Sequence, residues 1–432
     1  MKKRYVKVGM LGCGTVGSAV LKVLERNRAE IEQRIRTRLE VKRILVRDVK
    51  KKRTCVHDPA LLTTNPEDIL GDDEIDIVVE VIGGTEPARD YLVEAMRRGK
   101  SVVTANKEVM ARHGQEVFET AARFGVGVGF EASVGGGIPI IKTLKQALAA
   151  NRVETIMGII NGTTNYILTR MSHEGKTFEE SLQEAQEQGY AESDPAADID
   201  GHDAARKLAI LASIAFGVRI KDEDVYREGL RRVSVEDIEY GRELGWELKL
   251  LAIGKRNQDD IEIRVHPTFI PTWHPLASIR NEFNAVFVRG DALGDSMYYG
   301  RGAGGEPTAS AVIADIIDIV HDPNGGGGLM GCTCFAHTPI RPFENVECEY
   351  YLRLEALDRP GVLARIAKVF GDNEISLNSV IQKKSLGETA EIVLVTHLTR
   401  EGNLQKAVEL TRGLDCVAAV HNVIRIEGGH YM

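Results

Sequence analysis

VKVGMLGCGTVGSAVLKVLERN, residues 6–27, decides the fold of the first part of the chain. A short apolar run leads into a glycine-rich turn, and apolar side chains then recur at the spacing of an amphipathic helix. The stretch therefore predicts a strand, a turn and a helix. More apolar runs follow, separated by helical patterns, and they lie at residues 41–46, 74–84 and 101–106. This alternation predicts an α/β fold with a parallel, doubly wound sheet over residues 1–130.

The turn contains a complete G-x-G-x-x-G pattern formed by Gly12, Gly14 and Gly17, with Thr15 and Val16 before the last glycine. Between a strand and a helix, such glycines allow a tight turn and a close approach of the backbone to a pyrophosphate. The amino terminus of the helix adds N–H groups that favour an anion. We therefore predict a Rossmann nucleotide-binding domain, with a structural glycine turn as the alternative.

The end of the second predicted strand bears on the choice between NADP and NAD. Arg47 and Asp48 lie there, and four basic residues follow at 50–53. A carboxylate at this place favours NAD, whereas a guanidinium with nearby lysines accepts the 2′-phosphate of NADP. We favour NADP bound through Arg47, while NAD and a solvated basic loop remain open.

Lys107 follows the strand predicted at residues 101–106. The carboxyl ends of parallel strands form the ligand crevice of a doubly wound sheet, so the side chain is expected near the nicotinamide. It would hold a substrate carbonyl or carboxylate, or relay a proton. A solvated lysine at a strand end is the alternative.

Two further domains are predicted after the first. Residues 131–321 form an α+β substrate-binding and dimerisation domain, whose final segment from about residue 300 returns to the nucleotide-binding domain. Its strands are predicted at 153–160, 248–253, 261–265 and 285–288, and its last helix at 307–321. Residues 322–346 form a glycine-rich linker around the glycines at 325–328. Residues 347–432 follow a ferredoxin-like βαββαβ order.

Composition limits the classes of function. The 432 residues include 55 Lys and Arg against 63 Asp and Glu, a formal net charge of -8, which is unlike the basic footprint of nucleic-acid binders. Apolar runs stay far below the roughly 20 residues that cross a bilayer. We expect no nucleic acid or membrane partner and a cytoplasmic location. The six cysteines fit a reducing compartment, and Cys332 with Cys334 is interpreted as two loop thiols rather than a zinc site.

An acid-rich segment, GYAESDPAADIDGHDAARKLAILASIAFG at residues 189–217, leads into an amphipathic helix. Asp203 and Lys207 are four residues apart and share a face at the start of this helix. An ordinary surface ion pair is the alternative interpretation. The density of acidic residues suits capture of a substrate ammonium group, for which the candidates are Glu192, Asp198 and Asp200.

Residues 185–207 resemble, at every specified position, the signature of the homoserine dehydrogenase family. TANKE around Lys107, EASVGGGIPI from Glu131, NGTTNYIL from Asn161 and GRGAGGEPTASAV from Gly300 are also similar to that family. The resemblance covers about the first 320 residues. It implies NAD(P)-dependent interconversion of L-homoserine and L-aspartate 4-semialdehyde in threonine, methionine and isoleucine biosynthesis.

The resemblance also implies roles for individual residues. Lys207 is expected to donate and accept the proton at the reacting oxygen, supported by Asp203, with Lys107 beside substrate and nicotinamide. Glu192 is expected to hold the amino group of homoserine, while Asp198 stays a substrate-binding candidate on the density of acidic residues alone. A sodium ion is expected between Glu131 and the backbone carbonyls of three residues, and the cofactor is expected to contact Gly304. The three carbonyls belong to Val134, Gly136 and Ile138.

The third block resembles an ACT domain, a small regulatory module of amino-acid metabolism. Residues 358–363, DRPGVL, are similar to its first turn, which binds an amino-acid carboxylate. The resemblance implies an effector site at Asp358, Gly361 and Val362, with threonine as the natural effector, and a homodimer or homotetramer. A domain that has lost its ligand is the alternative.

Two other functions stay open. The first is a dehydrogenase acting on another small aldehyde or alcohol derived from an amino acid. The second is an amino-acid-sensing binding protein with an inactive nucleotide domain. The retained candidate residues argue against the second, namely Gly12, Gly14, Gly17, Lys107, Glu192, Asp203 and Lys207.

Overall fold

The computed structural model describes residues 5–322, 331–385 and 387–428. The glycine run at 325–328, in the predicted linker, lies outside the described residues. The chain divides into two compact units. The first comprises Met1–Ile156, Arg206–Asp224 and Asn284–His337, and the second comprises Met157–Ala205, Val225–Phe283 and Thr338–Met432. Within the described ranges, every helix is too short or too polar to cross a bilayer.

The first unit contains a six-stranded parallel sheet in the order β3-β2-β1-β4-β5-β6. Its strands are β1 (Tyr5–Leu11), β2 (Arg38–Leu45), β3 (Leu62–Thr63), β4 (Ile77–Glu80), β5 (Ser101–Thr104) and β6 (Val128–Gly129). The strand order reverses between β1 and β4. This reversal confirms the predicted doubly wound sheet and places its ligand crevice at the carboxyl ends of those two strands.

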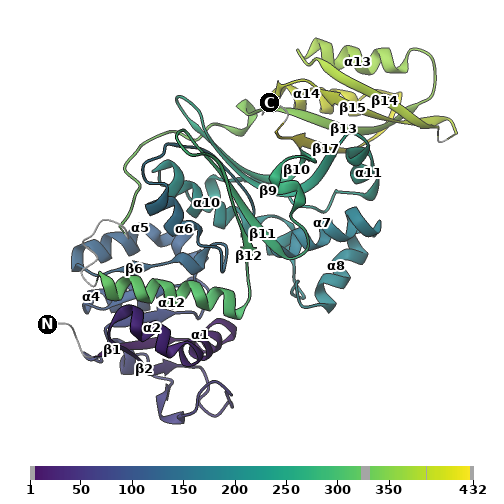
Figure 1. Cartoon of the computed structure of the whole chain (residues 1–432). Helices are drawn as coiled ribbons and strands as arrows, with labels where there is room; N and C mark the ends of the chain where they lie inside the picture. Colours follow the sequence, from purple (N-terminus) through teal and green to yellow (C-terminus); the bar gives the residue numbers. More distant parts are fainter. Residues whose placement is uncertain (1–4, 323–330, 386, 429–432) are drawn as a thin grey trace. The chain divides into compact units, whose positions relative to one another are not determined.

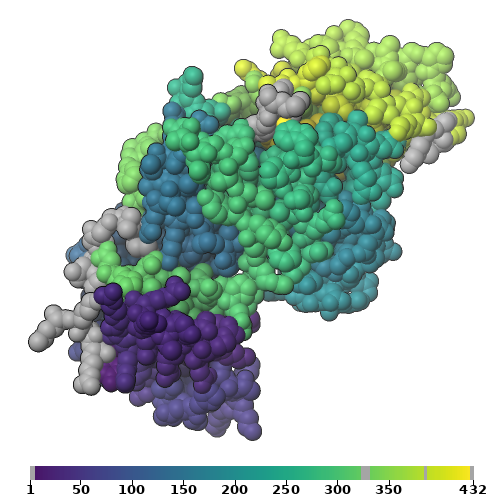
Figure 2. Space-filling model, viewed as in Figure 1, coloured from purple at the N-terminus to yellow at the C-terminus, as the bar shows by residue number. Residues whose placement is uncertain are grey.

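The helices of the nucleotide-binding part surround this sheet. They are α1 (Thr15–Arg26), α2 (Arg28–Ile35), α3 (Glu67–Leu70), α4 (Ala88–Arg97), α5 (Lys107–Phe124) and, from far along the chain, α12 (Gly305–His321). Val312 and Ile316 of α12 share one apolar core with Val20 of α1 and Val8 of β1. Figure 1 shows α12 lying along α1 and α2, and in Figure 2 its green atoms pack directly on the purple ones.

The rest of the first unit includes a short helical region, α6 (Ile140–Lys142), and the strands β11 (Phe283–Gly290) and β12 (Gly294–Arg301). Strand β12 was not among the predicted strands. It lies at an edge beside β11, and all of its residues are exposed or half-buried. Its sequence GDSMYYGR lacks a regular apolar alternation, because an edge strand with little buried surface does not require one.

The second unit carries helices α7 (Gly162–Glu174), α8 (Phe178–Glu187), α9 (Ala196–Ile199) and α11 (Val235–Glu243). Its strands include β8 (Tyr226–Arg227), β9 (Trp246–Arg256) and β10 (Ile261–Pro271). Strand β7 (Val153–Ile159) and helix α10 (His202–Phe216) each run across the boundary between the units. The strands β9 and β10 are longer than predicted and pair along their whole lengths.

The C-terminal block confirms the predicted βαββαβ order, with one short extra strand. Its elements are β13 (Glu347–Leu357), α13 (Val362–Asp372), β14 (Leu377–Ser385), β15 (Thr389–Thr396), β16 (Thr399–Arg400), α14 (Glu401–Arg412) and β17 (Val417–Ile426). The sheet order is β17-β13-β15-β14, and both helices contribute to one apolar core on it. Strand β17 also pairs with β10 in parallel, so this sheet continues into the rest of the second unit (Figure 1).

Strand β10 is buried along its entire length, polar residues included. It pairs with β9 throughout, with β8 at Arg264 and Val265, and with β17 at Thr268 and Phe269. Arg264 on β10 is fully buried and forms an ion pair with Glu427, which follows β17. Lys255 of β9 contacts the same carboxylate at 2.6 Å. These two cations lower the pKa of Glu427 to about 2, against the opposing effect of burial.

Candidate functional site

The glycine loop after β1 has the shape that a dinucleotide requires. Gly12 has a φ of +109°, and a Cβ there would lie 2.9 Å from the carbonyl oxygen of Val81. A Cβ on Gly17 would lie 2.5 Å from the carbonyl oxygen of Gly12, so only glycine allows α1 to pack this closely on the turn. A Cβ on Gly14 would meet nothing within 4 Å. Two glycines thus close the turn, while the third leaves an open side for a pyrophosphate.

Two helices begin beside this loop. Helix α1 starts at Thr15, with Val16 next and no side-chain cap on Gly14, so its first N–H groups face the open side. Gly304 precedes α12 with a φ of +115°, and a Cβ on its neighbour Gly305 would lie 3.2 Å from the carbonyl oxygen of Thr15. The structure therefore brings Gly304 to the loop, although almost 290 residues separate them in sequence.

Arg47 is exposed in the segment that follows β2. The neighbouring Asp48 is engaged locally, because its Oδ1 accepts from the Lys50 N–H at 2.8 Å and its carbonyl accepts from Arg53 at 2.9 Å. The carboxylate expected of an NAD-selective site is therefore bound into its own turn. Arg47 therefore lies next to a carboxylate that is already hydrogen-bonded within its own turn.

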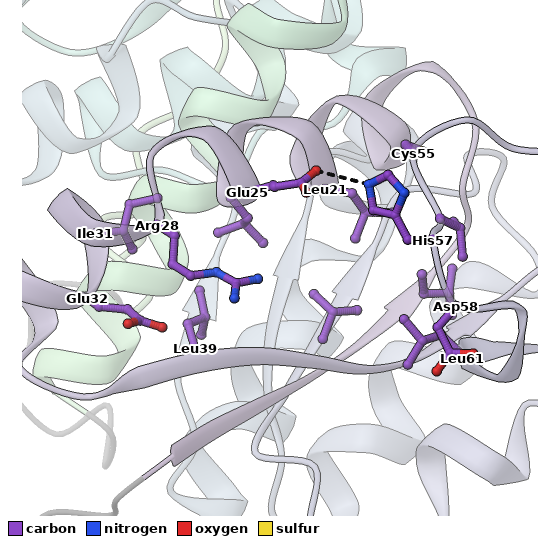
Figure 3. A pocket seen from close by; sticks show the side chains of 14 residues that line it. Leu21, Glu25, Arg28, Ile31, Glu32, Leu39, Cys55, His57, Asp58 and Leu61 are labelled. Atoms are coloured by element: carbon purple, nitrogen blue, oxygen red, sulfur yellow. Dashed lines mark hydrogen bonds and ion pairs between the residues drawn. The ribbon is translucent and has the colours of Figure 1, made fainter.

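A cavity of about 220 Å³ lies farther along the same segment, between α1, α2 and β2 (Figure 3). Its floor is apolar and includes Leu21, Leu39 and Leu61. On its rim, the ring of His57 lies 3.3 Å from the Glu25 carboxylate. The cavity shows that residues 55–61 cover this part of the sheet loosely.

Lys107 is the first residue of α5, directly after the carboxyl end of β5. Asn106 caps the helix, since its Oδ1 accepts from the N–H groups of Glu108 and Val109, both at 3.1 Å. The Asn106 amide also donates to the carbonyl of Gly84 at 2.7 Å. The backbone of Lys107 is thereby fixed at the predicted edge of the sheet, and its side chain is half-buried.

Asn161 organises the acid-rich segment. Its side-chain amide donates to Asp198 at 2.7 Å and to Asp203 at 2.9 Å, while its Oδ1 caps α7 by accepting from Thr164. Thr163 donates a second hydrogen bond to Asp198, at 3.2 Å. Asn161 thus holds two of the predicted carboxylates together, although the sequence pattern NGTTNYIL predicts no role for it.

Helix α10 carries Asp203, which is buried, and Lys207, which is half-buried, on one face. Arg206 lies between them in sequence and donates to Glu108 of α5 at 2.8 Å. Lys107 is the sequence neighbour of Glu108, and Lys207 is the sequence neighbour of Arg206. The two lysines therefore flank one ion pair. The sequence interpretation missed this pair, and the position of Glu108 beside Lys107 was its one signal.

The two other acidic candidates lie differently. Glu192 is exposed on the segment between α8 and α9, where its backbone carbonyl accepts from Gln186 at 3.0 Å. Asp200 forms a two-point ion pair with Arg231, at 2.6 and 2.9 Å, which lowers the pKa of the carboxyl. Asp200 is therefore already neutralised, and Asp198 and Asp203 make up the cluster around Asn161.

Glu131 is buried after β6, and burial raises its pKa. Its two carboxylate oxygens accept from the N–H groups of Ile141 and Lys142, each at 2.8 Å. The carbonyl of Ile138 accepts from Ile140 at 2.8 Å. Gly136, with a φ of +54°, packs so closely on Gly302 that a Cβ would lie 2.6 Å from its backbone. Val134 is buried in the same turn.

The groups at this turn that could bind a cation are carboxylate and carbonyl oxygens. Each carboxylate or carbonyl oxygen has two lone pairs, so the hydrogen bonds at Glu131 and Ile138 leave room for a hard cation. Across the described parts of the chain, no cluster of three or more His, Cys, Asp or Glu side chains suits a metal ion. A metal here would thus depend on backbone carbonyls.

The predicted effector turn joins β13 to α13. Gly361 has a φ of +90° and precedes α13 without a side-chain cap, and Val362 is buried. The Asp358 carboxylate accepts from Gln382 of β14 at 3.1 Å. The positive φ of Gly361 is a backbone conformation that glycine adopts readily and other residues rarely adopt.

Comparisons with known proteins found similar families and relatives. The chain matches the family described as "Homoserine dehydrogenase, NAD binding domain" over residues 12–131, "Homoserine dehydrogenase" over 139–317 and "ACT domain" over 350–415. It is similar to a homoserine dehydrogenase of Synechocystis, with 47% identity covering 98% of this chain and 99% of the relative.

Solved structures agree as well. A homoserine dehydrogenase from Thiobacillus denitrificans superposes with a TM-score of 0.93 at 48% identity, covering 98% of each chain. A hyperthermophilic archaeal homoserine dehydrogenase in complex with NADPH gives a TM-score of 0.63 at 30% identity, covering 74% of this chain and 98% of that one.

Proposed function

Because the chain belongs to the homoserine dehydrogenase family, we propose roles for its own residues in the reaction of that family. The chain is an NAD(P)-dependent oxidoreductase that interconverts L-homoserine and L-aspartate 4-semialdehyde, in the biosynthesis of threonine, methionine and isoleucine. Its C-terminal ACT domain fits regulation of that activity. The other small-substrate dehydrogenase and the amino-acid sensor, both left open by the sequence, give way to this assignment.

Lys207 acts as the acid and base at the reacting oxygen. When bound, NAD(P) supplies the hydride acceptor or donor, so the protein must move one proton at the alcohol or carbonyl oxygen. A lysine ammonium is protonated near neutral pH and can donate directly during aldehyde reduction. The observation that carries this role is the single face of α10 shared by Lys207 and the buried Asp203.

Asp203 and Lys107 support that step. The Asn161 amide orients the Asp203 carboxylate. The negative charge of this carboxylate stabilises the protonated, positively charged form of Lys207. The Asn106 cap fixes the backbone of Lys107, and we assign its side chain to the substrate oxygen and the nicotinamide. Glu192 and Asp198 supply negative charge for the substrate ammonium group, Asp198 from the Asn161 cluster.

NADP is the preferred cofactor. The loop of Gly12, Gly14 and Gly17 holds the pyrophosphate with the first turn of α1, and Gly304 closes the opposite side. Arg47 takes the 2′-phosphate, since Asp48 is bound within its own turn. The test is to mix protein and L-homoserine with NADP or NAD and follow reduced nicotinamide. Turnover with NAD at an equal or higher kcat/KM would contradict the preference.

A sodium ion binds at the turn after β6. Glu131 and the carbonyls of Val134, Gly136 and Ile138 form a set of hard oxygen donors around one buried charge. The ion would neutralise the Glu131 carboxylate and stiffen the turn. Thermal melting at equal ionic strength in sodium and in tetramethylammonium chloride tests this site. The site would be excluded if the wild type melted at the same temperature in both salts and if Glu131→Gln left that melting temperature unchanged.

The ACT domain binds an amino-acid effector at Asp358, Gly361 and Val362, and we assign threonine to this site because it is the pathway's end product. The enzyme is a cytoplasmic homodimer or homotetramer. We keep the division predicted from the sequence as a proposal, namely 1–130 with a return contribution from about 300–321, 131–321, the linker 322–346, and 347–432. Homoserine oxidation measured with and without threonine, and light scattering of the purified protein, test these points. An unchanged rate in saturating threonine would exclude that effector.

A further inference from the structure

Two cysteines meet at the dinucleotide loop. Cys13 stands between Gly12 and Gly14, and its Sγ lies 3.9 Å from the Sγ of Cys55. Both residues are free thiols and half-buried. The fold explains the meeting, because β1 and β2 are parallel neighbours and the segments that follow them leave the same edge of the sheet. The Gly12 N–H also donates to the Leu45 carbonyl at 3.1 Å, which fixes the loop to the end of β2.

We propose that Cys13 and Cys55 form a reversible disulfide, and that this disulfide weakens the binding of the dinucleotide. The site would thus be an oxidative modification site at the cofactor loop. The proposal uses the NAD(P)-binding role of the loop and goes beyond the catalytic assignment.

The distance is favourable for a bond. A disulfide requires about 2.05 Å between sulfur atoms, so the two thiols must approach by roughly 2 Å. Cys13 is flanked by two glycines, and Cys55 lies in an irregular segment, as Figure 3 shows at the rim of the cavity. Neither end of the bond therefore requires a regular helix or strand to move.

The chemistry balances with a peroxide as oxidant. One thiolate attacks a peroxide oxygen, the O–O bond breaks, and a sulfenic acid and water result. The second thiolate attacks the sulfenic sulfur and releases a second water as the S–S bond forms. The two thiols lose two electrons and two protons to hydrogen peroxide. Burial raises the pKa of the Cys13 thiol, so we expect the reaction to accelerate as the pH rises.

The consequence for the cofactor follows from where the two cysteines lie. Cys13 belongs to the turn whose open side is at Gly14, and Cys55 belongs to the segment that begins with Arg47. The disulfide draws these two segments together. The turn that binds the pyrophosphate and the segment that binds the 2′-phosphate then lose the arrangement that they have in the reduced protein. An increase of about tenfold in the dissociation constant of NADPH is expected.

The experiment uses the full-length protein, treated with hydrogen peroxide and then freed of it. Peptide mass spectrometry should find Cys13 joined to Cys55, with the loss of two hydrogen atoms. Fluorescence titration with NADPH should show the weaker binding, and dithiothreitol should restore it. Neither readout depends on homoserine turnover, so failure of the catalytic assignment would remain distinguishable.

Matched variants complete the test. Cys55→Ser should keep its NADPH affinity after peroxide treatment, whereas Cys334→Ser should lose affinity as the wild type does. Three results would each overturn the proposal. They are an oxidised protein without the Cys13–Cys55 peptide, a disulfide that leaves the dissociation constant unchanged, and an equal loss of affinity in Cys55→Ser.

Discussion

Arg206 donates a hydrogen bond to Glu108 at 2.8 Å, and this contact joins the start of α10 to the start of α5. A carboxylate in the first turn of a helix is favourable, whereas a cation there is not. Glu108 occupies such a first-turn position in α5, and Asp222 also approaches Arg206, at 3.6 Å. The pair fixes the backbones of the adjacent Lys107 and Lys207 relative to each other.

Replacing Glu108 by Gln should lower kcat about tenfold, because a small misplacement of a reacting group has effects of this size or larger. The KM for the dinucleotide should change little, since the Asn106 cap uses the backbone N–H of Glu108 rather than its side chain. Steady-state kinetics with both substrates varied measure the two constants. Glu94→Gln, which breaks an ion pair with Arg98 on α4, is the control and should leave kcat near the wild-type value. An unchanged kcat in Glu108→Gln would contradict the positioning role.

Lys207→Ala should lower kcat by at least about 100-fold, the lower range for loss of a general acid or base. The dissociation constant of NADPH should remain near that of the wild type, because the cofactor loop belongs to other elements. Stopped-flow turnover and fluorescence titration provide the two values. Lys221→Ala removes an exposed lysine in the turn that follows α10 and should have no effect on either. Parallel loss of turnover and NADPH binding would instead identify Lys207 as a structural residue.

Local sequence patterns predicted the parts of the fold that depend on neighbouring residues. The glycine loop and the βαββαβ block follow from spacing within one or two elements, and the structure confirms them. The contacts that shape the site are of another kind. Asn161 reaches Asp203 across 42 residues, and Arg206 reaches Glu108 across 98. No periodicity encodes such pairs, because they arise when separate elements pack.

The buried polar face of β10 is a second instance. Glu262 and Arg264 alternate with apolar residues, a pattern typical of a strand with one solvated face. In the structure both residues are buried, and Arg264 forms an ion pair with the Glu427 carboxylate. Sequence patterning could not reveal this burial, because Glu427 lies about 160 residues farther along the chain.

The contact of the ACT domain with α11 leads to a prediction about stability. Arg353 of β13 donates to Asp237 of α11 at 2.7 Å and to Glu391 of β15 at 3.0 Å, and all three residues are buried. Arg353→Ala leaves two buried carboxylates without their cation, so the free energy of unfolding should fall by about 3–5 kcal/mol. Urea denaturation followed by circular dichroism measures it.

A matched control separates burial from the mere loss of an ion pair. Arg365 forms an ion pair with Asp415 in the same domain, and their side chains are 50% and 80% exposed. Arg365→Ala should therefore alter the free energy of unfolding far less than Arg353→Ala does, because an exposed ion pair contributes little to stability. A loss at Arg353 no larger than the loss at Arg365 would mean that the buried carboxylates tolerate the missing cation.

The buried carboxyl of Asp315 on α12 leads to a prediction of how the free energy of unfolding depends on pH. The residue is fully buried, and this burial raises the pKa of its carboxyl from 3.8 to about 7, while Lys142 opposes the shift and Glu131 adds to it. At pH values between 3.8 and about 7, the Asp315 carboxyl is protonated in the folded protein and ionised in the unfolded chain. The contribution to stability is therefore complete below about pH 4 and is lost as the pH rises through 7, at up to about 1.4 kcal/mol per pH unit.

Asp315→Asn should remove this part of the pH dependence, because the amide oxygen still accepts from the Glu131 N–H, which lies 2.9 Å from the native carboxylate, and no longer titrates. Urea denaturation at a series of pH values between about 4 and 8 measures the slope. The neighbouring Asp318 is 36% exposed and forms an ion pair with the same Lys142, so Asp318→Asn should keep the wild-type slope. If Asp315→Asn and the wild type lost stability in parallel over this range, the proton held by the folded state would have to reside on another group.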